Sequence, residues 1–257
     1  DLNDKIFQNA VVHSMILWFT KDRKENYLIK IWNSKQINWE SFNIPSSYFC
    51  EQENYNFLVN AYKHRKFIEK FKDKSISLWD VLDIRQTIKT WNDKIYIKEI
   101  KEKDNFQPIL RWKDIWKYFY SSPDLYVDYW KHLANPINWI IFEQPKILIR
   151  EAGNSIIATY DDKNFYIMSS LYNWIPKDTN FDLKYILWLL NSKLLLFFMK
   201  VLVYNKVEWA FTKARIFHYD LLFIKNISEE KQKPFIFLTA NQDTETINAA
   251  ANLAPAA

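Results

Sequence analysis

The chain has 257 residues, of which 49% are apolar and 18% aromatic, and a formal net charge of +5. This length allows one large domain or two small ones with a buried core, and the charge is compatible with a polyanionic partner without indicating one. A single cysteine, Cys50, excludes an internal disulfide framework and is typical of a reducing compartment, so we expect a cytoplasmic protein.

Metal sites, leader peptides and membrane spans are not predicted. The four histidines are scattered and lack the spacing of a zinc site. The first residues are acidic and polar, unlike a signal peptide, and the lack of an initiator Met suggests a fragment. The most hydrophobic stretch, residues 185–203, contains Asn191, Lys193 and Lys200, which disfavour a membrane span.

The amino-terminal segments predict a hairpin followed by a linker and a helix. Residues 11–20 and 27–32 have the pattern of two strands, and because two strands alone are marginal, we expect them to be the edge of a larger sheet. Residues 33–55 are polar and turn-rich, which favours a linker. Residues 57–71 have helical spacing, and their basic run is interpreted as a solvated face, with a phosphate-facing helix as the alternative.

Residues 78–97 (LWDVLDIRQTIKTWNDKIYI) are the stretch around which the remainder is organised. An apolar-periodic run leads into a polar loop that carries Arg85 and Lys89, and an alternating strand over residues 95–97 follows. A loop of this kind between two ordered elements can present side chains to a ligand.

Basic and aromatic residues interleave over residues 108–120 and 125–130. The pattern fits an aromatic core with solvated edges. The alternative is a groove in which Arg and Lys contact phosphates or guanine edges.

The second half predicts further strands and one long helix. Residues 145–150, 155–160 and 165–168 read as an antiparallel meander. Residues 182–203 predict a helix that Asp182 caps. Residues 211–216 and 221–224 predict closing strands, and no function is assigned to the tail from residue 229.

No complete catalytic motif is present. The single glycine, Gly153, excludes both the P-loop and the dinucleotide-binding fingerprint. The acidic residues at 161–162 read as a hairpin turn rather than as part of a metal-dependent nuclease site. We therefore expect a binding module rather than a complete enzyme.

Five segments together resemble a known family. In order, PKILIR (145–150), SIIATYD (155–161) and YILWLLNSKLL (185–195) resemble the C-terminal specificity domain of TaqI-like adenine methyltransferases, which also occurs in fused type IIG restriction-modification enzymes. The stretch DIRQTIKTWNDKIYI (83–97) resembles the entry loop of that domain, and ILRWKDI (109–115) resembles the Arg-Gly-Lys/Arg-Asp-aliphatic segment that follows it.

Tryptophan stands at several positions where the family pattern has glycine. Six positions differ from the glycine of the family pattern. One is Thr87, and the other five are Trp79, Trp91, Trp112, Trp188 and Trp209. A turn that requires φ > 0 cannot easily take Trp. We hypothesise that the gene uses UGA for glycine and that UGA was translated as Trp; otherwise these are true tryptophans that could stack on bases.

The resemblance implies a fold and a role. The fold is α+β, with mixed, mainly antiparallel sheets and packed helices in a target recognition domain, preceded by an edge hairpin of a truncated α/β methyltransferase sheet. The implied divisions are residues 1–32 (hairpin), 33–76 (linker and helix), 77–228 (target recognition domain) and 229–257 (extension). The implied partners are double-stranded DNA and an upstream methyltransferase domain of the same protein, which would bind S-adenosylmethionine; no cofactor and no catalytic residue are expected in residues 1–257.

The resemblance also implies DNA-contacting residues. Arg and Asn side chains match the edges of guanine and adenine, and Lys suits phosphates. The candidates are Arg85, Lys89, Thr90, Asn92, Lys94, Arg111, Lys113, Lys146 and Arg150. Each could instead be an ordinary solvated surface group, and the alternative for the whole chain is an aromatic-rich protein–protein interaction module without DNA contact.

Overall fold

The computed structural model describes residues 26–33, 40–51, 59–129, 133–134, 137–177, 180–203, 213–228 and 230–232. The chain divides into two compact units, residues 1–65 and 66–257. The expected strand over residues 11–20, and with it the edge hairpin of a methyltransferase sheet, lies outside the described residues.

Unit 1 is built on an antiparallel hairpin of β1 (Leu28–Asn33) and β2 (Glu40–Pro45). The short helices α1 (Ser46–Cys50) and α2 (Val59–Lys63) follow. Residues 40–50 therefore form a strand and a helix where the polar sequence predicted a linker. Buried Ile44 and Phe49 explain the difference, because they provide apolar contacts that the turn-rich composition concealed.

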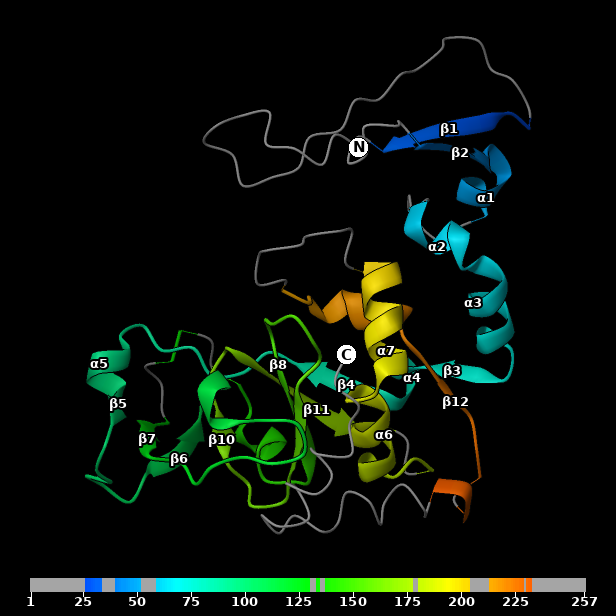
Figure 1. The fold of residues 1–257 in the computed structure, drawn as a ribbon. Helices are drawn as coiled ribbons and strands as arrows, with labels where there is room; N and C mark the ends of the chain where they lie inside the picture. Colours follow the sequence, from blue (N-terminus) through cyan, green and yellow to red (C-terminus); the bar gives the residue numbers. More distant parts are fainter. Residues whose placement is uncertain are drawn as a thin grey trace, which may run out of the picture. The chain divides into compact units, whose positions relative to one another are not determined.

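The described residues of unit 2 form two four-stranded sheets and a two-stranded ribbon (Figure 1). The central sheet has the order β4 (Leu82–Arg85), β11 (Leu171–Pro176), β8 (Lys146–Arg150) and β9 (Ala158–Asp161), with every pair antiparallel. The second sheet has the order β10 (Tyr166–Ile167), β6 (Phe106–Leu110), β7 (Leu125–Asp128) and β5 (Ile97–Lys98). The ribbon pairs β12 (Phe223–Lys225) with β3 (Ser75–Ser77).

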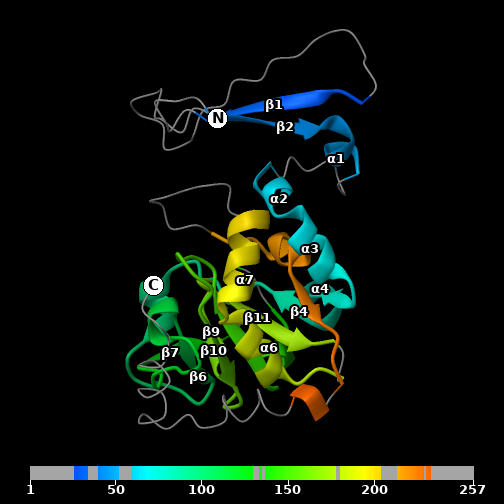
Figure 2. The same cartoon turned by 45° about the vertical axis from the view of Figure 1, so that its right-hand side comes forward.

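Helices cover one face of the central sheet, and the second sheet packs on the other side (Figure 2). The helical elements are α3 (Arg65–Lys72), α4 (Leu78–Val81), α5 (Asp93–Tyr96), α6 (Leu183–Leu190), α7 (Lys193–Phe198), the 3₁₀ turns η2 (Trp112–Asp114), η3 (Trp139–Ile141) and η5 (Ile216–Leu221), and the π-helical turn η4 (Met199–Val203). This is the expected α+β fold with mainly antiparallel sheets.

Alternation along the strands produces two apolar layers. Trp174 of β11 is fully buried and meets Tyr219 of η5 at 4.6 Å between ring centroids. Leu148 of β8 lies in the other layer, in a cluster with Ile109, Leu110 and Ile167 of the second sheet. Strands buried on both faces read as continuous apolar runs, which is why the PKILIR segment was recognisable as a strand.

The third meander strand and the long helix differ from their expectations. The predicted third meander strand is β10, which leaves the central sheet and pairs in parallel with β6 of the second sheet. The long helix begins after the Asp182 cap, as expected, but it breaks at Asn191, whose buried side chain bonds both backbone groups of Ala158 at 3.1 and 2.9 Å.

No single described helix has the length and apolarity of a membrane span; only the bent pair α6 and α7–η4 (55°) meets that criterion when the two parts are combined.

Candidate nucleic-acid interface

Hydrogen bonds fix the polar loop between β4 and α5 onto the turn that joins β10 to β11. Thr87 Oγ1 donates to the carbonyl of Leu171 at 2.9 Å. Ile88 exchanges backbone bonds with Ile167 and Ser169 at 3.1 and 2.7 Å. A loop bound in this way holds its outward side chains in defined positions, which specific recognition requires.

Four of the predicted DNA-contacting side chains are exposed on or beside this loop, namely Arg85, Lys89, Asn92 and Lys94. The Nε of Arg85 donates to Asp83 at 2.8 Å, and its side chain is 59% exposed. Asn92 caps α5 by accepting from the Lys94 backbone N–H at 3.1 Å. A bidentate contact of Asn92 with adenine would therefore use the oxygen that now caps the helix.

Thr90 is not available for a DNA contact in this structure. It is 7% exposed, and its hydroxyl donates to the Asp93 carboxylate. Its role is to fix the start of α5, and it is not among the residues that we propose to contact DNA.

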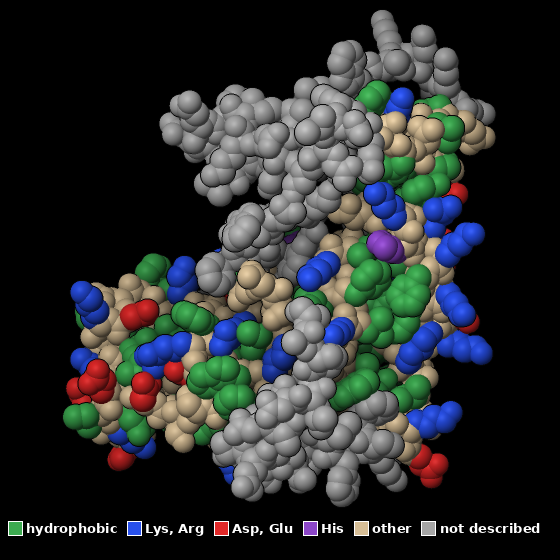
Figure 3. Space-filling model, in the orientation of Figure 1, with side chains coloured by type: hydrophobic (Ala, Val, Ile, Leu, Met, Phe, Trp, Pro, Cys, Tyr) green, Lys and Arg blue, Asp and Glu red, His purple; other side chains and the backbone are tan. Residues whose placement is uncertain are grey.

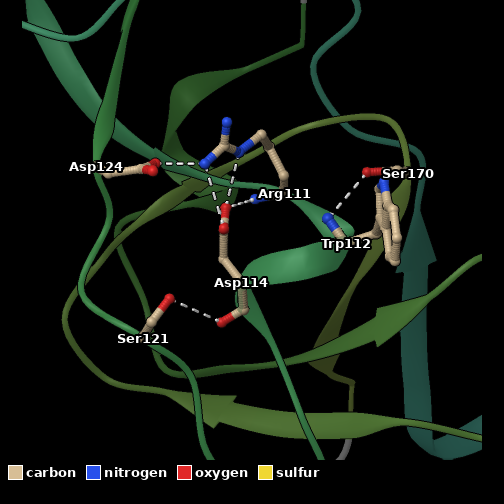
Figure 4. Close-up of polar contacts among 6 residues, drawn as sticks. All are labelled: Arg111, Trp112, Asp114, Ser121, Asp124 and Ser170. Carbon is tan, nitrogen blue, oxygen red and sulfur yellow. Dashed lines mark hydrogen bonds and ion pairs between the residues drawn. The ribbon is translucent and has the colours of Figure 1, made fainter.

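The η2 turn is held by a charged cluster around Arg111 (Figure 4). Asp114 accepts from the Arg111 backbone N–H at 2.7 Å and from its Nε at 3.0 Å, and Asp124 binds the Nη2. Burial lowers the pKa of Arg111, but the bonds and charges of both carboxylates outweigh that effect, and the net pKa is raised. Arg111 is thus mainly a clamp for η2, while the following Lys113 is exposed.

Arg150 links the end of β8 to the same turn. Its Nη2 donates to the carbonyl of Ile115, and its guanidinium lies 5.5 Å from the centre of the Trp112 ring. The Trp112 backbone N–H donates to Ser170 Oγ at 3.2 Å, and the indole extends past that serine (Figure 4). Burial lowers the pKa of Arg150, whose Nε is buried without a hydrogen-bond partner.

Lys146 is buried, whereas the sequence predicted an exposed side chain that contacts DNA. Alternation along the strand placed it on one face with Arg150, but that face is covered by the second sheet at the Lys146 end. Its Nζ is fully buried, 2.6 Å from Asp161 and 2.7 Å from the carbonyl of Phe142. The ammonium cannot reach a DNA phosphate in this structure, and the expectation for Lys146 is wrong.

Sequence reasoning missed two cations and their acidic partner at this end of the sheet. Glu151, just after β8, pairs with Lys213 at 3.2 Å and with Arg215 at 3.7 Å. Backbone bonds of Ala214 to Glu151 and of Glu151 to Ser170 hold the segments together. The alternation Lys-Ala-Arg over residues 213–215, within the strand predicted for residues 211–216, was the available signal.

The cations that gather where β4 and β8 end and β11 begins form what we call the basic rim. Its members are Arg85, Lys113, Arg150, Lys213 and Arg215. On the face drawn in Figure 3, Lys and Arg side chains lie over the middle and along α3, whereas Asp and Glu gather at the β5–β6 end. Within the described part of the chain, no three His, Cys, Asp or Glu side chains are grouped as a metal site.

Comparison with known proteins gives one family match. The family model described as the TaqI-like C-terminal specificity domain matches residues 107–221, which run from β6 to η5 and make up less than half of the chain. No curated protein matches the sequence. Residues 107–221 thus carry the sequence pattern of a specificity domain.

Two solved structures with weak similarity are the HsdS subunit from Thermoanaerobacter tengcongensis and a chain described under the structural basis of complex assembly and conformational transition of the type I R-M system. The first has a TM-score of 0.42 at 12% identity, over 76% of this chain and 47% of that one. The second has a TM-score of 0.43 at 12% identity, over 76% and 50%. The chain spans about half the length of each.

Proposed function

We propose that unit 2 recognises a specific sequence of duplex DNA as the specificity domain of a restriction-modification protein. The observation that carries this proposal is the match of residues 107–221 to the specificity-domain family. The matched segment supplies every member of the basic rim except Arg85, and the fixed polar loop lies beside it.

The exposed side chains differ in which part of the DNA they can contact, the base edges or the phosphates. Arg85 keeps both Nη groups uncommitted among the described residues, and such a fork matches the O6 and N7 acceptors of guanine. Asn92 is the candidate for adenine. Lys89, Lys94 and Lys113 are exposed ammonium groups suited to phosphates, which position the protein on the duplex without reading its sequence.

We further propose that the parent protein is an N6-adenine DNA methyltransferase, either alone or fused to a nuclease as in type IIG enzymes. The sequence segments that resemble TaqI-like enzymes support this finer assignment. In such a protein, a methyltransferase domain of the same chain binds S-adenosylmethionine and performs the chemistry in the cytoplasm, while residues 77–228 select the site.

The test is binding of the full chain to fluorescent duplex DNA at several salt concentrations. A pool of random duplexes is first enriched by repeated capture, and the enriched and starting pools are then compared. We expect enrichment of a short sequence and a steep decrease in affinity with salt, because phosphate contacts release counterions. Binding that is equal for every duplex would contradict sequence recognition.

The alternative is a protein–protein interaction module without DNA contact. The observation that favours it is the exposure of three large apolar side chains, Trp91, Ile100 and Phe217, which are 76, 74 and 67% exposed. Absence of DNA binding even at low salt would support this alternative.

A further inference from the structure

A pocket of about 290 Å³ opens on the second sheet, in addition to the basic rim and the polar loop. It is lined by Asn105, Gln107, Tyr129, Trp139, Glu143 and Tyr166. Gln107 on β6 and Tyr166 on β10 lie on the same face, because Tyr166 pairs with Ile109, two residues beyond Gln107. Neither the polar loop nor the basic rim contributes a residue to this lining.

The floor of the pocket is an aromatic cluster. Tyr129 and Tyr166 meet at 4.9 Å with an angle of 70° between their rings, and fully buried Phe142 stacks on Tyr166 at 4.6 Å. The Tyr129 hydroxyl donates to the carbonyl of Ile137, which fixes that ring in place. The floor is therefore rigid and offers the electron-rich faces and edges of its rings.

Among the residues that the structure describes, the lining carries one carboxylate, that of Glu143, and no cationic side chain. Glu143 is exposed and follows η3. Trp139 of η3 is 49% exposed and also lines the pocket. Asn105 donates its Nδ2 to Asp128 at 2.6 Å, so a second carboxylate lies beside this lining residue. Burial, and then the nearby Glu143 carboxylate, raise the pKa of Tyr166 to about 12, which agrees with a carboxylate that faces this ring.

These features select the ligand by charge and shape. Aromatic faces and a carboxylate both attract cations, and a phosphate is disfavoured because no Lys or Arg of the described residues lines the pocket. A volume of about 290 Å³ lies at the low end for cofactor pockets, which suits one long side chain. Arginine fits better than lysine, because its planar guanidinium can stack on a ring and bind a carboxylate through two N–H groups.

We propose that this pocket receives an arginine side chain of a partner polypeptide, with Glu143 as the anion and the aromatic floor as the stacking surface. The pocket is then a protein-docking site of unit 2, separate from the residues proposed to contact DNA.

The experiment is an NMR titration of the isotope-labelled full chain with N-acetyl-arginine amide. We expect saturable shifts of the Tyr129 and Tyr166 signals, and at least tenfold weaker binding of the neutral isostere N-acetyl-citrulline amide. Glu143→Gln should also weaken binding about tenfold, as expected for the loss of a charge-assisted bond. The matched control is Glu102→Gln, at an exposed residue outside the pocket, and it should bind like the parent.

Several results would overturn the proposal. Equal binding of the citrulline compound would remove the role of charge, and unchanged binding by Glu143→Gln would remove the role of that carboxylate. Shifts of the same signals by adenosine or cytidine, with none by the arginine compound, would identify a base-binding pocket instead. Because the DNA titration uses other residues, failure of either experiment leaves the other interpretable.

Discussion

Lys146 and Asp161 are direct cross-strand partners on β8 and β9, and their ion pair of 2.6 Å is fully buried. The carboxylate also accepts from the backbone N–H groups of Lys163 and Phe165 at 2.8 and 3.1 Å. Desolvation lowers the pKa of Lys146, against the opposing charge of Asp161. The pair thus secures the chain where it leaves the central sheet for the second one.

Removing one member of this pair should destabilise the domain strongly. Lys146→Met leaves a buried carboxylate without its cation, which typically costs about 3–5 kcal/mol. The double variant Lys146→Met/Asp161→Asn should recover part of that loss, because no net charge remains buried. Urea unfolding measures both, and Lys163→Met, at an exposed lysine, is the control that should change stability by less than about 0.5 kcal/mol. A loss below about 1 kcal/mol for Lys146→Met would show that the pair has little weight.

Three tyrosines should make the fold sensitive to alkali. Burial is the first cause that raises the pKa of Tyr120, Tyr166 and Tyr172 to about 12. An unfolded tyrosine loses its proton near pH 10, so between pH 10 and 12 the unfolded state holds fewer protons than the folded one. Stability is therefore fully present below pH 10 and falls as pH rises toward 12.

This pH dependence can be measured by phenolate absorbance and urea unfolding together. Tyr166→Phe should reduce the slope of the unfolding free energy by up to about 1.4 kcal/mol per pH unit in that window. A stability that stays constant from pH 10 to 12 would contradict the burial of these hydroxyl groups.

The polar loop gives a matched pair of DNA-binding variants. Arg85→Ala should cost about 1–3 kcal/mol and relax the sequence preference, because a fork that reads a base is lost. Lys89→Ala should weaken binding to every duplex equally and reduce the salt slope by about one. Lys101→Ala, at an exposed cation between β5 and β6, is the control. If both loop variants bind like the parent, the loop is not the contact surface.

The tryptophans at glycine positions of the family can be tested through the gene and through stability. Trp79, Trp91 and Trp112 are 39, 76 and 54% exposed, so glycine at these positions should change the unfolding free energy by about 1 kcal/mol or less. Trp174→Ala, in the core, should cost about 3–5 kcal/mol. We expect UGA codons at positions 79, 91, 112, 188 and 209, and UGG codons would exclude the glycine hypothesis.

The backbone gives that hypothesis no additional support. The non-glycine residues with positive φ in the described chain are Asn26, Lys74, Tyr118 and Asn164, and none of them is a tryptophan. The argument from left-handed turns therefore does not apply to Trp79, Trp91, Trp112 or Trp188 in this structure. The remaining physical observation is the exposure of Trp79, Trp91 and Trp112.

Apolar runs made much of the fold predictable. The strand of residues 146–150 and the helix that Asp182 caps were visible because burial on one or two faces leaves a periodic pattern. The pairing of β10 with β6 was not visible, since two residues carry no register information and the choice of sheet depends on packing far away in the sequence. The short α5, where a strand was expected, depends on the Asn92 cap, which competes locally with an alternating pattern.

The candidate site was predictable only as a set of residue types. Exposed Arg85 and Lys113 were found because polar loops carry reachable cations. Lys146 was misassigned, because alternation gives the face of a strand but not what covers that face. The availability of Thr90 and Arg111 for DNA contact was overestimated for another reason. Each binds an aspartate three residues further along the chain, Asp93 and Asp114, and these local bonds occupy the groups that a DNA contact would need.

The chain crosses between sheets twice within a few residues, from β9 in the central sheet to β10 in the second and back to β11. Neither sheet is a separable module, because the strands of the two sheets alternate along the chain. The second-sheet strands β5, β6 and β7 lie between β4 and β8 of the central sheet, and β10 lies between β9 and β11. An attempt to transplant DNA preference by grafting one sheet, or a single loop with its flanking strands, would cut this double crossing. The smallest span that keeps both sheets and this double crossing intact runs from β4 to β11.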